Sequence, residues 1–336
     1  MDIIIERGYR SVLFVALGGG GDVATAAMLA RASRRLGVEA RIASVAWERY
    51  MIDPVPGPIR LEEIQGAKRV GEYSALVNRD TFAIRGGRRI VFQAVNVSRI
   101  INEEVGVVDL YRGVLGVRRG IEELRDFFGA EVVIGVDVGG DILATGYEED
   151  LWSPLADFVG LASIKDLESI LAVHSPGGDG ELSQEYVLSR ISLVASRRGF
   201  LGARGLTPED YEFLKRLLEH VSSEASKTSL YAFEGLNKKI SMRSGSREAY
   251  ISIINTLTFL LDPRVVADLN PIVNHLVDTK SIYEARDILR SLGIFTELDL
   301  EEEVSKLIAS GSEISGEAIL EIKRRYRSRR SQLSST

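Results

Sequence analysis

Three short apolar runs in this chain each end in glycines and acidic residues. The runs cover residues 11–17, 132–136 and 169–174. Each is short, rich in β-branched residues and followed by residues that break regular structure, which indicates a buried strand. The segments that follow are Gly18-Gly19-Gly20-Gly21-Asp22, Asp137-Val138-Gly139-Gly140-Asp141 and Ser175-Pro176-Gly177-Gly178-Asp179-Gly180-Glu181. Because unpaired charge is costly to bury, these acids belong either in a solvated loop or in a cation site.

Helical patterns alternate with these strand-like runs. Amphipathic spacing extends from Asp22 to about Leu36 and recurs in residues 117–128 and 183–196. Further segments predict a strand at 40–46, a loop at 52–66, and a strand or hairpin region at 75–98 with Gly86-Gly87 inside it. The alternation predicts an α/β fold, a doubly wound and mainly parallel sheet with helices on both faces.

The C-terminal third is expected to be mostly helical. Helical patterns predict helices at residues 207–222, 248–261, 281–291 and 298–327. No linker separates residues 1–205, which form the sheet, from residues 206–336. We therefore expect residues 1–336 to form a single α/β domain, with the helical portion packed on the sheet-forming core.

Composition narrows the classes of function. The 336 residues include no cysteine, which excludes disulfides, thiolate metal sites and cysteine nucleophiles, and the three histidines show no zinc-type spacing. A net charge of −6 gives no attraction to nucleic acid or to an anionic membrane. There is no signal-like N-terminal segment and no apolar run of membrane-spanning length, so we expect a cytoplasmic location.

The acids at the strand ends are expected to meet. Parallel strands joined by right-handed crossovers finish along one edge of a sheet, and ligands bind there, near the reversal of strand order. Asp137 and Asp141 flank two glycines in a loop that can turn both carboxylates inward. Hard cations such as Mg²⁺, Mn²⁺ or Ca²⁺ prefer such oxygen ligands. The alternative, a solvated acidic loop, suits Glu148 better.

The glycine turn at 177–180 leaves two roles open for its acids. Asp179 and Glu181 complete the cation site, or they cap the helix expected to begin at Ser183. His174 ends the preceding strand, where it binds metal, moves a proton or is purely structural.

The glycines after the first strand offer a site for an anion. Gly18–Gly21 allow the backbone to approach a ligand closely, and the helix that follows presents free N–H groups. A dinucleotide-binding fingerprint can be fitted to this loop with Glu48 as the ribose-binding acid, but Asp22 then lies where the pyrophosphate would bind. The alternative is a tight turn in which Asp22 caps the helix.

Residues 243–247 read Arg-Ser-Gly-Ser-Arg before the predicted helix 248–261, a sequence that is compatible with a second anion site. Two arginines, two hydroxyls and a helix N-terminus suit an oxyanion such as phosphate. The alternative is a surface helix start with Ser246 as its cap. Asn96 closes an apolar run and either faces the same edge of the sheet or forms a turn.

The motifs LGGGGDV (17–23), GVDVGGDILATGYEEDLWSPLAD (135–157) and PGGDGEL (176–182) give the chain a family resemblance. From Val12 to about Pro263 it resembles the archaeal domain-of-unknown-function family 1152 and, more distantly, the D-glutamate cyclase family, which also has an aspartate-glycine-glycine turn. The resemblance implies an α/β fold, bound divalent cations, a homo-oligomer (a dimer or a tetramer) and metal-dependent phosphatase activity. The metal ligands that it implies are Asp22, Asp137, Asp141, Asp150 and Asp179, with Glu181 as the alternative to Asp179.

We therefore expect a metal-dependent hydrolase that acts on a small phosphorylated metabolite, with Mg²⁺ or Mn²⁺. A lyase similar to the glutamate cyclases, and a nucleotide- or metabolite-binding protein without catalysis, are the alternatives. The residues assigned to catalysis are Asp137, Asp141 and Arg247. Those assigned to the substrate are Gly18, Gly19, Gly20, Gly21, Asn96, Gly177, Gly178 and Arg243, with Arg243 or Arg247 neutralising charge in the transition state.

Overall fold

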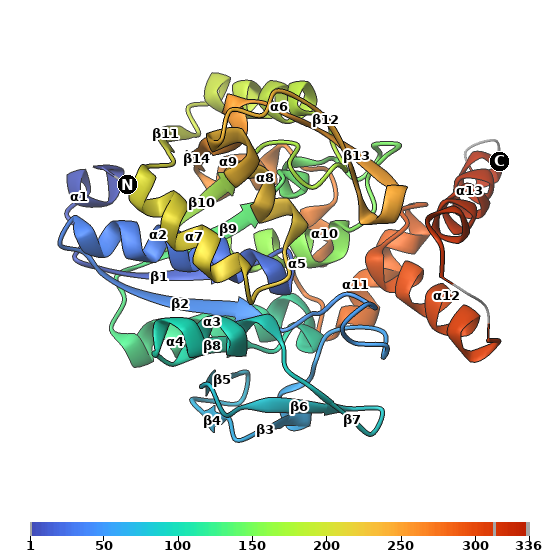
Figure 1. The fold of residues 1–336 in the computed structure, drawn as a ribbon, viewed down its shortest axis with the longest axis horizontal. Helices are drawn as coiled ribbons and strands as arrows, with labels where there is room; N and C mark the ends of the chain where they lie inside the picture. Colours follow the sequence, from blue (N-terminus) through green and yellow to red (C-terminus); the bar gives the residue numbers. More distant parts are fainter. Residues whose placement is uncertain (1, 312–313, 334–336) are drawn as a thin grey trace.

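A nine-stranded mixed sheet forms the centre of the protein (Figure 1), in a computed structural model that describes residues 2–311 and 314–333. The five middle strands are parallel, and an antiparallel pair extends the sheet at each edge. In spatial order the strands are β11 (Phe200–Gly205), β14 (Leu257–Leu261), β10 (Ser169–His174), β9 (Val132–Val138), β1 (Ser11–Ala16), β2 (Glu39–Val45), β8 (Val105–Val108), β5 (Ser74–Val77) and β4 (Lys68–Arg69).

The strand order reverses at β1. β2 and β8 follow on one side of it, whereas β9 and β10 follow on the other. Val15 of β1 pairs with Ala43 of β2 and with Gly135 of β9, so the three strands end at the same level. In an open α/β sheet the ligand site lies beyond the carboxyl ends of the strands at such a reversal. That point is occupied here by Gly18–Gly21 and by Asp137.

Helices cover both faces of the sheet. Side chains alternate along β1, so that Leu13 and Val15 join the core on one face while Val12 and Phe14 join the core on the other. Burial on both faces explains why the parallel strands read as continuous apolar runs. The first face packs α4 (Gly113–Phe128), α5 (Pro154–Ile164), α6 (Gln184–Ser196), α9 (Pro263–Asp268), α10 (Val273–Leu276) and α11 (Ile282–Ser291). The second packs α1 (Asp2–Glu6), α2 (Val23–Arg35), α3 (Gln93–Ile101), α7 (Pro208–Leu218) and α8 (Glu224–Phe233).

Smaller elements surround this layered body. A three-stranded sheet is formed by β3 (Ile64–Gln65), β6 (Phe82–Arg85) and β7 (Arg88–Ile90), and a hairpin by β12 (Lys238–Met242) and β13 (Arg247–Ile251). The last helices, α12 (Glu297–Ala309) and α13 (Gly316–Leu333), lie together at one end of the molecule (Figure 1). They enclose a small apolar cluster that includes Trp152, Leu300 and Ile319.

The α/β prediction, with a largely parallel sheet and a helical C-terminal region, is confirmed. The hairpin expected around Gly86-Gly87 is present as β6 and β7, because both glycines adopt the positive φ angles that the turn needs. No helix in the described ranges 2–311 and 314–333 is long and apolar enough to cross a membrane.

Two local predictions are wrong. The helix predicted over 248–261 is instead β13 and β14, joined by a short 3₁₀ turn (Ile253–Thr256), and β14 is inserted between β10 and β11. Pairing with those strands outweighs the apolar spacing that indicated a helix. Asn96 does not close a strand. It lies within α3, whose valines and alanine face the core as a helix does, and its side chain donates a hydrogen bond to Gln93 at 3.2 Å.

His174 has a structural position that makes a prediction about stability. It is fully buried in β10, and its Nδ1 lies 2.8 Å from the hydroxyl of Thr258. Burial, with the charge of Arg204 nearby, lowers the pKa of His174 from 6.5 to about 3. The imidazole is therefore neutral in the folded chain at pH 5, whereas in the unfolded chain it takes up a proton below about pH 6.5.

The unfolding free energy should consequently fall as the pH falls from 6.5 toward 3. Between pH 7 and pH 5 we expect the wild type to lose about 2 kcal/mol more than the His174→Asn variant, measured by denaturant unfolding at both values. The control is His220→Asn, because His220 is exposed; it should keep the wild-type dependence on pH. An equal loss in His174→Asn and wild type would show that His174 binds a proton equally in both states.

Candidate metal centre

A cavity of about 350 Å³ opens at the carboxyl ends of the middle strands. Its walls are the glycine loop after β1, residues 47–52 after β2, the turns after β9 and β10, residues 243–247 of the hairpin, and parts of α12 and α13. The lining contains nine acidic residues and three arginines. This excess of negative charge distinguishes the cavity from an ordinary apolar ligand pocket.

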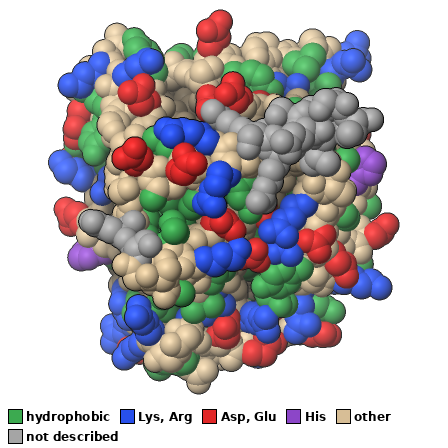
Figure 2. Space-filling model, turned by 90° about the vertical axis from the view of Figure 1, so that its right-hand side faces the viewer, with side chains coloured by type: hydrophobic (Ala, Val, Ile, Leu, Met, Phe, Trp, Pro, Cys, Tyr) green, Lys and Arg blue, Asp and Glu red, His purple; other side chains and the backbone are tan. Residues whose placement is uncertain are grey.

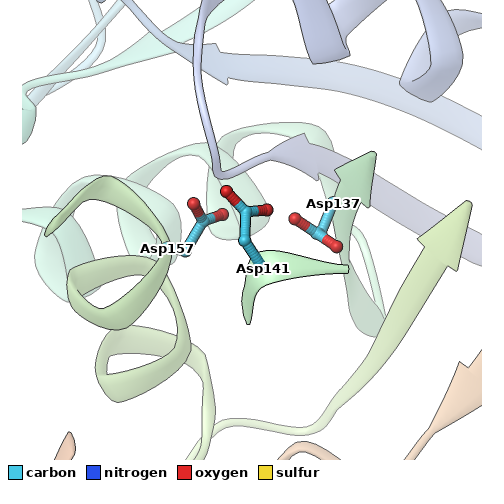
Figure 3. A group of neighbouring side chains, drawn as sticks. All are labelled: Asp137, Asp141 and Asp157. Carbon is cyan, nitrogen blue, oxygen red and sulfur yellow. The ribbon is translucent and has the colours of Figure 1, made fainter. Parts of the chain in front are cut away.

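Three aspartates from different elements meet at the floor of the cavity. Asp137 comes from the end of β9, Asp141 follows the Gly139-Gly140 turn, and Asp157 lies in the first turn of α5. Oxygen atoms of all three lie within 4.8 Å of one another, and Asp141 stands between the other two (Figure 3). Gly139 and Gly140 have φ angles of 120° and 102°, a backbone that a side chain would strain. The glycine turn thus brings Asp141 back over the strand end.

Asp141 also belongs to a second carboxylate group, with Asp179 and Glu181 from the turn after β10. These oxygens too lie within 4.8 Å of one another. Glu181 is held in place by the backbone N–H groups of Trp152 and Ser153, at 2.6 and 2.9 Å, and by the hydroxyl of Ser153. Asp179 and Glu181 do not cap α6, because Ser183 performs that role by accepting a hydrogen bond from Tyr186 N.

The buried carboxylates lack the partners that anions need. Both oxygens of Asp137, Oδ1 of Asp157 and Oδ2 of Asp179 have no hydrogen-bond partner within the described part of the chain. Burial raises the pKa of Asp137 to about 6 and, together with the nearby Glu181, that of Asp179 to about 7. Burial and neighbouring acids raise the pKa values of Asp141 and Asp157 well above the usual range. Such a cluster is stable only with bound protons or with a cation.

Asp22 extends the acidic cluster from the glycine loop. It begins α2, yet its side chain makes no capping hydrogen bond; it lines the cavity instead. Burial and the charge of Asp137 raise its pKa well above the usual range. A methyl group on Gly18 would lie 2.5 Å from Oδ1 of Asp157 and 2.9 Å from Oδ2 of Asp22. Glycine at this position therefore leaves room for the two carboxylates, and the reading of Asp22 as a helix cap does not hold.

Three arginines supply positive charge in the same cavity: Arg49, Arg243 and Arg247. Arg247 forms an ion pair with Glu181 at 2.7 Å, and Arg243 one with Glu224 at 3.2 Å. Burial, with Arg247 and Arg49 nearby, lowers the pKa of Arg243 to about 10. Arg243 and Ser244 both have positive φ angles, 51° and 54°. Such backbone strain in non-glycine residues is concentrated at functional sites.

The face that carries α12 and α13 shows basic and acidic side chains intermixed (Figure 2).

The turn at 243–247 is not a helix N-terminus, as the sequence had indicated, but the tip of the β12–β13 hairpin. Its Ser246 hydroxyl donates to the backbone oxygen of Arg243 at 2.8 Å, which closes the turn. The predicted pair of arginines nevertheless lines the cavity together with both serines.

The motifs that build this cavity match a known family, described as "Protein of unknown function (DUF1152)", over residues 13–305. The chain belongs to the DUF1152 family. No curated protein and no solved structure matches it. In this DUF1152 protein the matched region contains all five carboxylates of the two groups and the three cavity arginines, while α13 follows it.

Several predicted site residues of this DUF1152 protein lie outside the cavity lining. Asp150 is exposed and forms an ion pair with Lys323 at 3.5 Å. Gly177 and Gly178 shape the turn after β10: the N–H of Gly177 binds the carbonyl of Gly139 at 2.7 Å, and Gly178 packs against Thr228. Asn96 and His174 lie outside the lining as well. The remaining candidates line the cavity: Gly18, Gly19, Gly20, Gly21, Asp22, Asp141, Asp179, Glu181, Arg243 and Arg247. Asp137 lies next to Asp141, outside the cavity lining.

Sequence reasoning missed four charged residues of the site. Asp157 is the one acid in the otherwise apolar stretch of α5, which was an available signal, and Arg49 follows directly after β2. Glu297 of α12 accepts hydrogen bonds from the N–H groups of Leu155 and Ala156, at 3.0 and 2.8 Å. Glu301, also on α12, accepts from the indole of Trp47 at 2.9 Å. No local sequence pattern indicates that α12 packs against the ends of the strands.

Removal of one buried charge should stabilise the protein when no metal is bound. Because Asp137 is fully buried among like charges without a partner, Asp137→Asn should raise the melting temperature of chelator-treated protein. It should also reduce the stabilisation by Mn²⁺, which for the wild type is about 2.7 kcal/mol at one hundred times the dissociation constant. Thermal unfolding with and without Mn²⁺ measures both effects.

The control for this comparison is Asp126→Asn, since Asp126 is exposed on the last turn of α4, at the opposite edge of the sheet. It should leave the stabilisation by Mn²⁺ unchanged. A metal-free Asp137→Asn protein that melts below the wild type would contradict the account of Asp137 as an uncompensated buried charge.

Proposed function

We propose that this protein is a divalent-cation-dependent hydrolase that acts on a small phosphorylated metabolite. The observation that supports the proposal most directly is the cluster of Asp137, Asp141 and Asp157, three buried acids whose oxygens lie within 4.8 Å of one another beside a cavity that also contains arginines. Both oxygens of Asp137 and Oδ1 of Asp157 have no hydrogen-bond partner in the described part of the chain. Hard divalent cations such as Mg²⁺ and Mn²⁺ bind oxygen ligands of this kind. The volume of about 350 Å³ suits a small metabolite.

The donor set fits a divalent cation. It consists entirely of oxygen atoms, and three of them at mutual distances up to 4.8 Å can surround an ion whose bonds to oxygen are about 2.1–2.4 Å long. A bound cation supplies Lewis-acid polarisation of the phosphoryl oxygens and a water of lowered pKa. Asp137, Asp141 and Asp157 would hold it in place, and Glu297 fixes the N-terminus of α5, on which Asp157 lies.

The arginines complement the phosphoryl group. Arg49 and half-buried Arg243 line the cavity, where they can meet an anion. Guanidinium groups bind phosphate oxygens through two hydrogen bonds at once, and they neutralise charge that builds up during transfer. The glycine loop at 18–21 has no side chains, so that a substrate can reach the acidic cluster from that side. The chain thus provides a cation end and an anion end in one cavity.

Assays of phosphate release from a panel of phosphomonoesters, including sugar phosphates and nucleoside monophosphates, test this function. We expect turnover with Mn²⁺ or Mg²⁺ that chelator abolishes and added metal restores. Phosphate release that is indifferent to chelator, or no release from any member of the panel, would contradict the proposal. A mass change in a carboxylate substrate without phosphate release would instead favour the lyase alternative.

Substitution of Arg243 tests the anion end separately. Loss of a charge-assisted hydrogen bond costs about 1.5–3 kcal/mol, so Arg243→Gln should raise the KM for the phosphoester roughly 10- to 100-fold while the affinity for Mn²⁺ stays at the wild-type value. Steady-state kinetics and a Mn²⁺ titration give the two quantities. Arg119→Gln is the matched control, because Arg119 is exposed on α4. An unchanged KM in Arg243→Gln would remove Arg243 from substrate binding.

A further inference from the structure

We propose that the acidic cluster holds two divalent cations bridged by Asp141, an inner one at Asp137 and Asp157 and an outer one at Asp179 and Glu181. The inference rests on the proposed function only for what the two ions would do to a substrate. The two sites themselves are argued from the positions of the carboxylates. Each group offers three oxygens within 4.8 Å of one another, and Asp141 is the member that they share. One carboxylate between two cations is a common arrangement in two-metal sites, where the ions lie about 3.5–4 Å apart.

Unpartnered buried oxygens occur in both groups. Asp137 is completely buried with neither oxygen bonded, and Oδ1 of Asp157 is likewise without a partner in the described ranges. In the outer group the same holds for Oδ2 of Asp179, a residue that is 5% exposed. Buried polar atoms in folded proteins are almost always satisfied. A single cation at the inner group would leave Oδ2 of Asp179 without a partner, which supports a second ion at the outer group.

The fold brings the two groups together through a close approach of the β9 and β10 turns. A methyl group on Gly139 would lie 2.5 Å from Cγ of Asp179, so only glycine allows Asp179 to reach Asp141. The N–H of Gly139 also donates to the carbonyl of His174 at 2.9 Å, and the N–H of Gly177 donates to the carbonyl of Gly139 at 2.7 Å. These reciprocal bonds fix the inner and outer groups relative to each other.

The two sites should differ in affinity. Glu181 in the outer group is already bonded to Arg247, to the hydroxyl of Ser153 and to two backbone N–H groups. These donors compete with a cation for its oxygens, and the guanidinium of Arg247 repels a cation directly. The inner group has no comparable ion pair among the described residues. We infer that the inner site fills first and the outer site fills at higher concentration.

Titration of chelator-treated full-length protein with Mn²⁺ alone tests the two-ion centre. Equilibrium dialysis should give two ions per chain in two steps at least 10-fold apart in affinity. Electron paramagnetic resonance should show the six-line spectrum of isolated Mn²⁺ after the first step. After the second step this should give way to a broad spectrum of two exchange-coupled ions, because the shared carboxylate of Asp141 links them.

Isosteric variants assign the steps to the sites. Asp137→Asn should remove the tight binding step, and Asp179→Asn should remove the weak one. Asp141→Asn should remove both binding steps and, with them, the spectrum of coupled ions. The matched control is again the exposed Asp126→Asn, which should retain two steps. Thermal unfolding of each variant, recorded with circular dichroism, separates loss of binding from loss of folding.

A single ion at saturation, two ions without coupling, or loss of the same step in Asp137→Asn and Asp179→Asn would overturn the two-ion centre. These outcomes are distinct from failure of the proposed function. Chelator-sensitive phosphate release with one bound ion would refute the second site and leave the hydrolase standing. Two coupled ions without phosphate release from any phosphoester would support the two-ion centre and refute the hydrolase.

Discussion

The balance of charge around Asp141 determines how the rest of this structure is arranged. Four other carboxylates from three elements approach this residue closely in a space that water barely reaches. Repulsion between like charges and the loss of hydration both oppose such packing, and only protons or cations can offset them. Among the described residues, Arg247 is the arginine bonded to the cluster; it neutralises Glu181 but leaves Asp137, Asp157 and Asp179 uncompensated. Divalent cations meet this requirement with the oxygen ligands that they prefer.

The surrounding fold serves this arrangement in specific ways. Glycines stand where a side chain would collide with a carboxylate, at Gly18 against Asp157 and at Gly139 against Asp179. Glu297 reaches from α12 to the start of α5, so the C-terminal helices contribute to the position of the floor as well as to the wall. The strained tip of the β12–β13 hairpin brings Arg243 to the cavity wall.

Much of the fold and part of the site follow from sequence alone. Apolar runs followed by glycine turns identify three of the parallel strands, β1, β9 and β10, whereas β8 was not predicted. Because parallel strands end at one edge, the meeting of Asp137, Asp141 and Asp179 is a consequence of topology. Asp157 was missed although it is the one acid in an apolar stretch. The contributions of Arg49 and Glu297 could not be derived, because each depends on how distant elements pack. The helix predicted at 248–261 failed for a related reason: pairing with β10 and β11 decides the structure of this segment, and local spacing does not record it.

The most direct test of the account is a crystal structure of the protein grown with Mn²⁺, with data collected where manganese scatters anomalously. The account predicts an anomalous peak within about 2.4 Å of carboxylate oxygens from Asp137, Asp141 and Asp157. An empty cluster at saturating Mn²⁺, with these aspartates hydrogen-bonded to one another as protonated acids, would contradict it.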